Sequence, residues 1–124
     1  MDVVFTEREG YLEATLWQTD SIAVLKEQFA VILKTCMERT PERLLCDMTP
    51  FSGVWSVMDR YELGIAGAQF APHVGRVACL ARPGMIDPEK FGAQVARNRG
   101  LSVDVFDDRE KALAAGCDDY VSKP

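Results

Sequence analysis

Alternating hydrophobic and polar positions open the chain. Val3–Glu9 and Tyr11–Trp17 both have the strand pattern, and Gly10 stands between them. Glycine readily adopts the left-handed conformations that tight turns require, so a short connection between antiparallel neighbours is expected here. The pattern predicts an N-terminal β-hairpin.

The period then changes from two residues to that of an α-helix. Asp20 is a predicted N-cap, and the helix is expected to end before Pro41. Lys26 and Lys34 fall on the side opposite the apolar one. The apolar stripe consists of Ile22, Leu25, Phe29, Ile32, Leu33 and Cys36. One long amphipathic helix is therefore predicted.

Three short apolar runs farther along the chain predict buried strands. Arg43–Asp47 is apolar in its middle and lies between prolines, as expected of a central strand. Arg76–Ala81 is a second such run, and the turn dipeptide Pro83–Gly84 follows it. Val103–Phe106 is the third, with valines that alternate with other residues.

The helix after Arg43–Asp47 follows an apolar loop. Its predicted N-cap is Ser56 or Asp59. The side chains expected to face inward are those of Tyr61, Ile65 and Ala68.

Gly64 and Gly67 lie inside this predicted helix. A glycine there costs about 1 kcal/mol relative to alanine. We therefore expect both at a close contact, either with the sheet or with a neighbouring subunit.

The last third of the chain is predicted to be helix, strand, helix. Asp87 and the proline after it are expected to start the first of these helices, and Gly100 ends it. Asp107 and Asp108 are expected to cap the last helix. Phe91, Val95 and Asn98 follow the helical spacing that predicts the first of these two helices.

Strands and helices thus alternate after the opening hairpin. This order predicts an α/β fold: a mostly parallel sheet of about five strands with an antiparallel edge hairpin and about four helices. The 124 residues contain no linker or repeat, so one domain over residues 1–124 is expected.

Composition and charge limit the classes of partner that the protein is expected to bind. A formal charge of -5 argues against nucleic acid, which requires clustered Lys and Arg. No apolar run is long enough to span a bilayer, and the first residues lack the order of a secretory signal. These features predict a cytoplasmic protein.

The sequence offers no recognisable catalytic set. The four cysteines are far apart, with no C-x-x-C pair, and a single histidine, His73, lies in an expected loop. We therefore expect reduced cysteines and no metal site. The common hydrolase, zinc and nucleotide motifs are absent, which predicts a protein that is not an enzyme and holds no cofactor.

Two sequence segments, together with this order of elements, resemble a known protein family. They are Met58–Gly64 (MDRYELG) and Phe91–Ala115, notably the VARNRGL of Val95–Leu101. The chain resembles the STAS domains typified by sporulation anti-sigma-factor antagonists, and more closely the uncharacterised SpoIIAA-like bacterial proteins sometimes grouped with lipid-binding Sec14-type domains. The resemblance implies the STAS fold and a signalling or protein-interaction module.

In those antagonists, a serine at the start of the helix after the central strand is phosphorylated. Arg60 holds that position here. Ser52 and Ser56 lie nearby and are the candidate phosphorylation sites, although Ser56 also suits an ordinary N-cap.

The last ten residues, 115–124, look like the end of a response-regulator receiver domain. In such domains a lysine, here Lys123, contacts a phosphorylated aspartate, for which Asp47 is the candidate. Glu7 and Glu9 alternate and do not form the adjacent acidic pair that binds magnesium in receivers. A degenerate receiver-like domain is a further alternative.

The loop before the second helix is unusually apolar. Loops normally lie at the surface and are polar, so something should cover this one. Its aromatics could fold over the core, it could form a partner or homodimer surface, or it could line a pocket for a small apolar ligand such as a lipid, with Phe70 as further lining. The candidate surface consists of Phe51, Val54, Trp55, Met58 and Tyr61.

Overall fold

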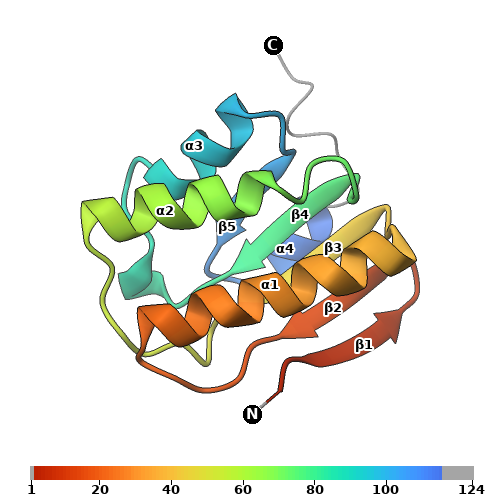
Figure 1. Cartoon of the computed structure of the whole chain (residues 1–124), viewed down its shortest axis with the longest axis horizontal. Helices are drawn as coiled ribbons and strands as arrows, with labels where there is room; N and C mark the ends of the chain where they lie inside the picture. The colour runs from red at the N-terminus through yellow and green to blue at the C-terminus, as the bar shows by residue number, and fades with distance from the viewer. Residues whose placement is uncertain (1, 116–124) are drawn as a thin grey trace.

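Five strands form one sheet in the order in which they occur along the chain (Figure 1). The computed structural model describes residues 2–115. The strands are β1 (Val4–Arg8), β2 (Tyr11–Thr15), β3 (Arg43–Asp47), β4 (Arg76–Leu80) and β5 (Val103–Phe106). Only β1 and β2 pair antiparallel, and all later neighbours are parallel. The predicted α/β class and the edge hairpin are confirmed.

Gly10 makes the hairpin turn. Its φ of +88° is in the left-handed region that glycine tolerates best. The register pairs Arg8 with Tyr11 next to the turn and Val4 with Thr15 at the far end. Both strands end earlier than the sequence pattern predicts.

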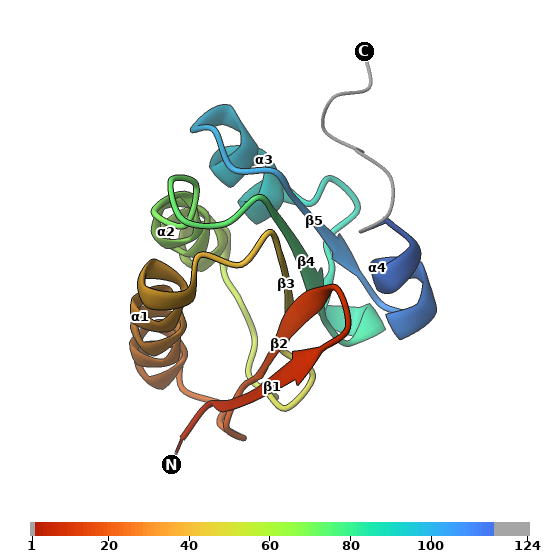
Figure 2. The same cartoon turned by 90° about the vertical axis from the view of Figure 1, so that its right-hand side faces the viewer.

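Helices cover the sheet unequally (Figure 2). Three helices lie on one face: α1 (Ile22–Arg39), α2 (Val57–Ala68) and α3 (Phe91–Asn98). Of the helices within residues 2–115, α4 (Arg109–Ala115) alone lies on the other face. Each parallel connection carries its helix on the same side, as expected when successive crossovers have the same hand. A short 3₁₀ helix, η1 (Pro83–Met85), follows β4.

Two predicted helix starts are wrong. Ser21, not Asp20, is the N-cap of α1, because Thr19 is still held in an extended bridge with Phe51. The α3 helix begins only at Phe91, after a turn. Asp87 nevertheless contributes to its start, since its Oδ2 accepts the Phe91 N–H at 3.1 Å. Asp108 caps α4 as predicted, accepting the Glu110 N–H at 2.8 Å.

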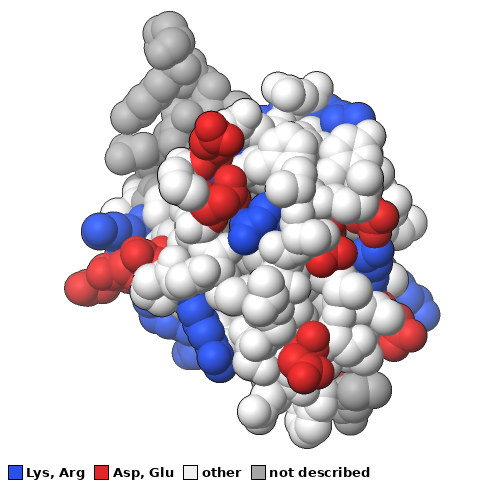
Figure 3. Space-filling view, turned by 90° about the vertical axis from the view of Figure 1, so that its left-hand side faces the viewer, with Lys and Arg blue, Asp and Glu red and all other residues white. Residues whose placement is uncertain are grey.

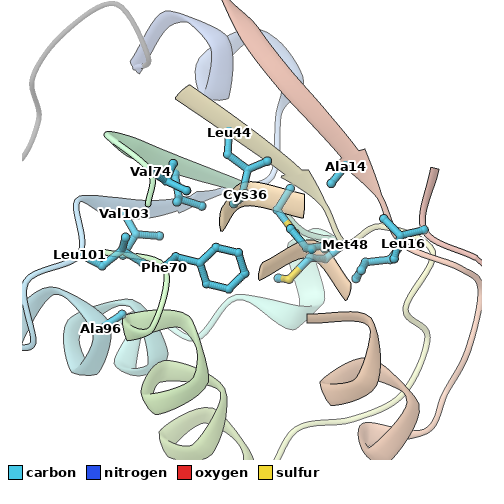
Figure 4. Close-up of a cluster of buried hydrophobic side chains, with 14 of the residues drawn as sticks. Ala14, Leu16, Cys36, Leu44, Met48, Phe70, Val74, Ala96, Leu101 and Val103 are labelled. Atoms are coloured by element: carbon cyan, nitrogen blue, oxygen red, sulfur yellow. The ribbon is translucent and has the colours of Figure 1, made fainter. Parts of the chain in front are cut away.

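The main core lies between the sheet and the layer of three helices (Figure 4). Figure 4 shows the ring of Phe70, just after α2, pointing into this cluster towards Met48. A smaller cluster, which includes Leu45 and Ala112, lies under α4 on the opposite face. The side chains fully enclosed in the main core include Leu25, Ile32 and Cys36.

The predicted orientation of α2 is wrong for Tyr61, which is 39% exposed. Gly64 is the buried residue of this helix, and an added Cβ there would lie 2.6 Å from the Gly92 carbonyl oxygen of α3. The predicted close contact is therefore found at Gly64, where the neighbour is another helix and not the sheet. The same prediction is wrong for Gly67, where an added Cβ would meet nothing closer than Ala96 at 3.9 Å. The contact at Gly64 fixes the rotation of α2 and turns Tyr61 outward.

Candidate functional site

The apolar loop before α2 divides into a covered half and an exposed half. Phe51 is 1% exposed and stacks on Trp55 with ring centroids 5.3 Å apart. Two backbone hydrogen bonds hold the loop: the Phe51 N–H donates to Met48 at 3.0 Å, and the Ser52 N–H donates to Thr19 at 2.9 Å. Phe51 and Trp55 therefore fold over the end of the core, which was one of the three expectations.

The remaining apolar side chains of this region face outward. Val54 is 88% exposed and Met58 is 61% exposed. Figure 3 shows the face on which α2 begins, where uncharged atoms cover most of the surface and charged side chains form small separate groups. We refer to four of these exposed residues together as the apolar surface: Val54, Val57, Met58 and Tyr61.

Ser56 holds the start of α2 in a capping box. Its Oγ accepts the Asp59 N–H at 3.0 Å, and the Asp59 carboxylate accepts the Ser56 N–H at 2.9 Å. Two N–H groups that the helix itself leaves unpaired are thereby satisfied. Ser56 is thus the N-cap, while Ser52 is an exposed residue of the loop.

Arg60 takes a central place beside the stacked aromatics. Its Nη1 donates to Asp87 Oδ1 at 3.0 Å and to the Met85 carbonyl oxygen at 3.3 Å. The guanidinium also lies over the Trp55 ring, 5.7 Å from its centroid. Arg60 therefore joins α2, η1 and the start of α3. The sequence shows Arg60 where the resembled antagonists have a serine, and it gives no sign of these contacts.

A cavity of about 110 Å³ lies next to Arg60, between the sheet and the helices α1, α2 and α3. Trp55 and Phe70 line the cavity, as expected if the loop forms part of a pocket for a small apolar ligand. The other candidate residues do not line it: Phe51, Val54, Met58 and Tyr61. Most of the lining is apolar. The candidate residues therefore belong to different places: a core cover, a cavity wall and an exposed surface.

Two cysteines face this cavity from neighbouring strands. Cys46 in β3 and Cys79 in β4 are register partners, and both are free. A hydrogen bond with Cys79 and burial raise the pKa of the Cys46 thiol well above its ordinary value. Burial raises the pKa of Cys36 to about 11. The thiols of Cys46 and Cys36 therefore stay protonated at neutral pH and are poor nucleophiles. Cys117 lies outside the described residues.

A separate polar cluster occupies the α4 face of the sheet. Glu13 is only 5% exposed, and Arg109 donates to both of its carboxylate oxygens, at 2.9 and 3.2 Å. Burial raises the pKa of Glu13, but the ion pairs with Arg109 and Arg8 outweigh it, so the pKa lies below its ordinary value of 4.5. Sequence reasoning missed this cluster, although a glutamate inside an apolar strand was a signal.

Asp47, the candidate phosphoacceptor of a receiver, belongs to the same cluster. Its Oδ1 accepts hydrogen bonds from Thr49 N at 3.0 Å and from Thr49 Oγ1 at 2.7 Å. Its Oδ2 accepts one from Arg109 at 3.3 Å. Asp47 is 8% exposed, and both of its carboxylate oxygens are engaged in these hydrogen bonds. Lys123 and the receiver-like tail lie outside the described residues, except for the end of α4.

No group of three or more metal-ligating side chains comes together within residues 2–115. His73 lies half-buried in the turn after α2, where its backbone N–H donates to the Phe70 carbonyl oxygen at 2.9 Å.

Among the described helices, none is both long and apolar enough to cross a membrane.

Comparisons with family models, with curated proteins and with solved structures found no match for this chain.

Proposed function

We propose that this protein is a non-enzymatic regulatory or interaction module of STAS/SpoIIAA-like type, which binds a protein through the apolar surface. The simplest partner is a second copy of the chain. The observation that carries the proposal is the exposure of neighbouring apolar side chains at one end of α2, from 39% at Tyr61 to 88% at Val54. Exposed apolar groups of this kind mark interaction sites when they gather in one place.

The local structure supports a binding role because it holds the surface in shape. The Ser56 capping box fixes the first turn of α2, which carries Val57 and Met58. The stacked pair Phe51 and Trp55 anchors the loop on either side of Val54. A surface that is ordered before binding loses less conformational entropy when a partner docks. Methionine and aromatic residues are also enriched at the centres of interfaces.

Light scattering coupled to size exclusion tests self-association. The variant Val57→Ser/Met58→Ser alters exposed side chains only and leaves the core pair Phe51 and Trp55 intact. We expect a wild-type dimer and a folded monomeric variant. The matched control is Val31→Ser/Met37→Ser, since these residues are 49% and 53% exposed and belong to a different helix, α1.

A different partner would leave the purified wild type monomeric. A photo-crosslinking side chain at position 58, compared with one at position 37, then tests binding in the producing cells. We expect a discrete adduct from position 58 alone. Identical adducts from both positions, or none from position 58, would contradict the proposal.

A second candidate function is the carriage of a small apolar ligand, and the cavity beside Arg60 favours it. A largely apolar cavity with a few polar groups at its edge is the usual form of a small-molecule site. Native mass spectrometry of freshly purified protein tests this function. Retained mass that is lost on denaturation is expected of a carrier, and a bare polypeptide mass from cells that supply the ligand argues against it.

A further inference from the structure

The cavity is bounded by backbone as much as by side chains. Gly64 and Gly67 of α2 and Gly92 of α3 all line it. A Cβ at Gly67 would meet nothing closer than Ala96 at 3.9 Å, so the space beside α2 is open there. Glycines and alanines on the two helices therefore leave a hollow over the strands that a larger residue would fill.

The size of the hollow limits what it can hold. Its volume of about 110 Å³ is smaller than the roughly 150 Å³ of an engineered cavity that binds benzene. A branched body of four or five carbons fits, and a lipid acyl chain does not unless the helices move. The aromatic ring of Trp55 and the thiols of Cys46 and Cys79 make the wall apolar and polarisable.

Three charged residues are part of the cavity lining. They are Arg60, Asp87 and Lys90, two cations against one anion. The Lys90 ammonium is engaged with Asp104 at 3.1 Å. Arg60 is the cation whose guanidinium lies against another wall residue, Trp55. Its side chain is only 19% exposed.

Arg60 has hydrogen-bonding capacity to spare. Its contacts to Asp87 and Met85 both use Nη1. Within the described part of the chain, no acceptor bonds its Nε or Nη2. These two atoms form one edge of the guanidinium, the edge that grips a carboxylate with two parallel N–H···O bonds. A largely buried cation with this edge unused is suited to a ligand that brings two acceptor oxygens.

We infer that the cavity binds a small carboxylic acid anion with a branched apolar body of about four or five carbons. The body lies between the glycines of α2 and the strands, and the carboxylate pairs with the Nε–Nη2 edge of Arg60. This inference rests on the second candidate function, because it names the chemistry of the ligand that the same cavity would carry. Arg60 is the residue that selects the acid over neutral molecules of the same shape.

Two ligands of matched shape test the selection: 3-methylbutanoate and its neutral amide, 3-methylbutanamide. Each is titrated into the protein while the amide NMR signals of Gly64, Gly67 and Gly92 are followed. We expect the acid to bind at least about tenfold more tightly, from the charge-assisted bidentate pair.

Four variants locate the effect. Arg60→Gln should abolish the preference for the acid, and Arg60→Lys should restore only part of it because lysine lacks the fork. Arg99→Gln is the matched control, since Arg99, the residue that follows α3, stacks over Tyr61 at the surface and does not line the cavity. It should keep the wild-type preference. Ala93→Leu, which fills the hollow, should weaken both ligands.

The outcomes separate the inference from the function on which it rests. Equal affinities for acid and amide, with shifts at the glycines, would overturn the inference and keep the carrier function. No saturable shift for either ligand up to about 10 mM would overturn both. If Arg60→Gln does not fold, the comparison of the two ligands on the wild type decides alone.

Discussion

Glu13 shows at the scale of one residue how a charge is accommodated inside a sheet. Its neighbours Leu12 and Ala14 face the main core, while Glu13 points to the α4 face and meets Arg109 and Arg8. Removing a carboxylate from water is costly unless hydrogen-bonded cations replace the water. Arg109 supplies that replacement from a helix 96 positions away in the sequence.

The lowered pKa of Glu13 makes part of the stability depend on pH. The unfolded chain takes up a proton near the ordinary value of 4.5, before the folded chain does. The stabilisation is therefore complete above that value and is lost as the pH falls through the folded pKa.

We expect Glu13→Gln to lower the free energy of unfolding by about 1–2 kcal/mol at pH 7, less than for a fully buried pair because Arg109 is partly exposed. The deficit should shrink towards zero at pH 3. Urea unfolding of both proteins from pH 7 to 3 measures it. Glu62→Gln is the control, since the Glu62 pair with Lys26 is exposed and should show little deficit at any pH. A deficit for Glu13→Gln that does not change with pH would contradict the linkage.

At the scale of elements, α2 and α3 approach each other through glycine. An added Cβ at Gly64 would come within 2.6 Å of the Gly92 carbonyl oxygen and 2.7 Å of the Val95 Cβ. Backbone cannot yield to such an overlap without moving a helix. Gly67 lies one turn later, where the same Cβ has room.

Gly64→Ala should therefore destabilise the protein by about 1–3 kcal/mol through overpacking. Gly67→Ala should stabilise it by up to about 1 kcal/mol, because alanine is the better helix former and meets no obstacle. Urea midpoints of the two variants and the wild type give the comparison. Effects of the same sign would show that helix propensity, and not the α2–α3 contact, decides at both positions.

The start of α2 offers a second prediction at this scale. Ser56→Ala removes the Oγ that accepts the Asp59 N–H, so it should cost about 1 kcal/mol. Ser52→Ala is the control, because Ser52 lies outside the helix and its own N–H bond to Thr19 is kept. Thermal unfolding of both variants measures the difference. An equal loss in both would mean that the hydroxyl of Ser56 does not cap the helix.

At the scale of the whole molecule, the inner strands of the sheet should be the last to open. β3 has a parallel neighbour on each side and four of its five residues buried, whereas β1 is an edge strand with no buried residue. Amide hydrogens at Leu44 and Leu45 should exchange slowest, and those of β1 at least about tenfold faster. Hydrogen exchange read by NMR measures this. Protection of β1 equal to that of β3 would indicate that something covers the edge.

The sequence predicted the order of the elements better than their exact ends. The strands Arg43–Asp47 and Val103–Phe106 have the predicted bounds, because apolar runs between turn residues leave little choice of register. The cap of α1 was misplaced by one residue, since a bridge between Thr19 and Phe51 delays the helix. Such a bridge joins distant segments and leaves no trace in a local pattern.

The candidate surface was predicted as one unit and was found to be three. The sequence showed that the loop is apolar. It did not show that Phe51 is buried while Val54, three positions later, is exposed. Arg60, which binds Asp87 and lies against Trp55, could not be recognised, because its partners come from other parts of the chain.

The sequence by itself determined the alternation of strands and helices, the hairpin turn at Gly10 and the α/β class, because these follow from spacing between near neighbours. Only the tertiary structure decided which side of α2 faces inward, where the cavity lies and how Glu13 is neutralised. Those outcomes depend on side chains brought together by three helices packing on one sheet. Contacts of that kind are set by shape and volume, which the order of polar and apolar residues does not record.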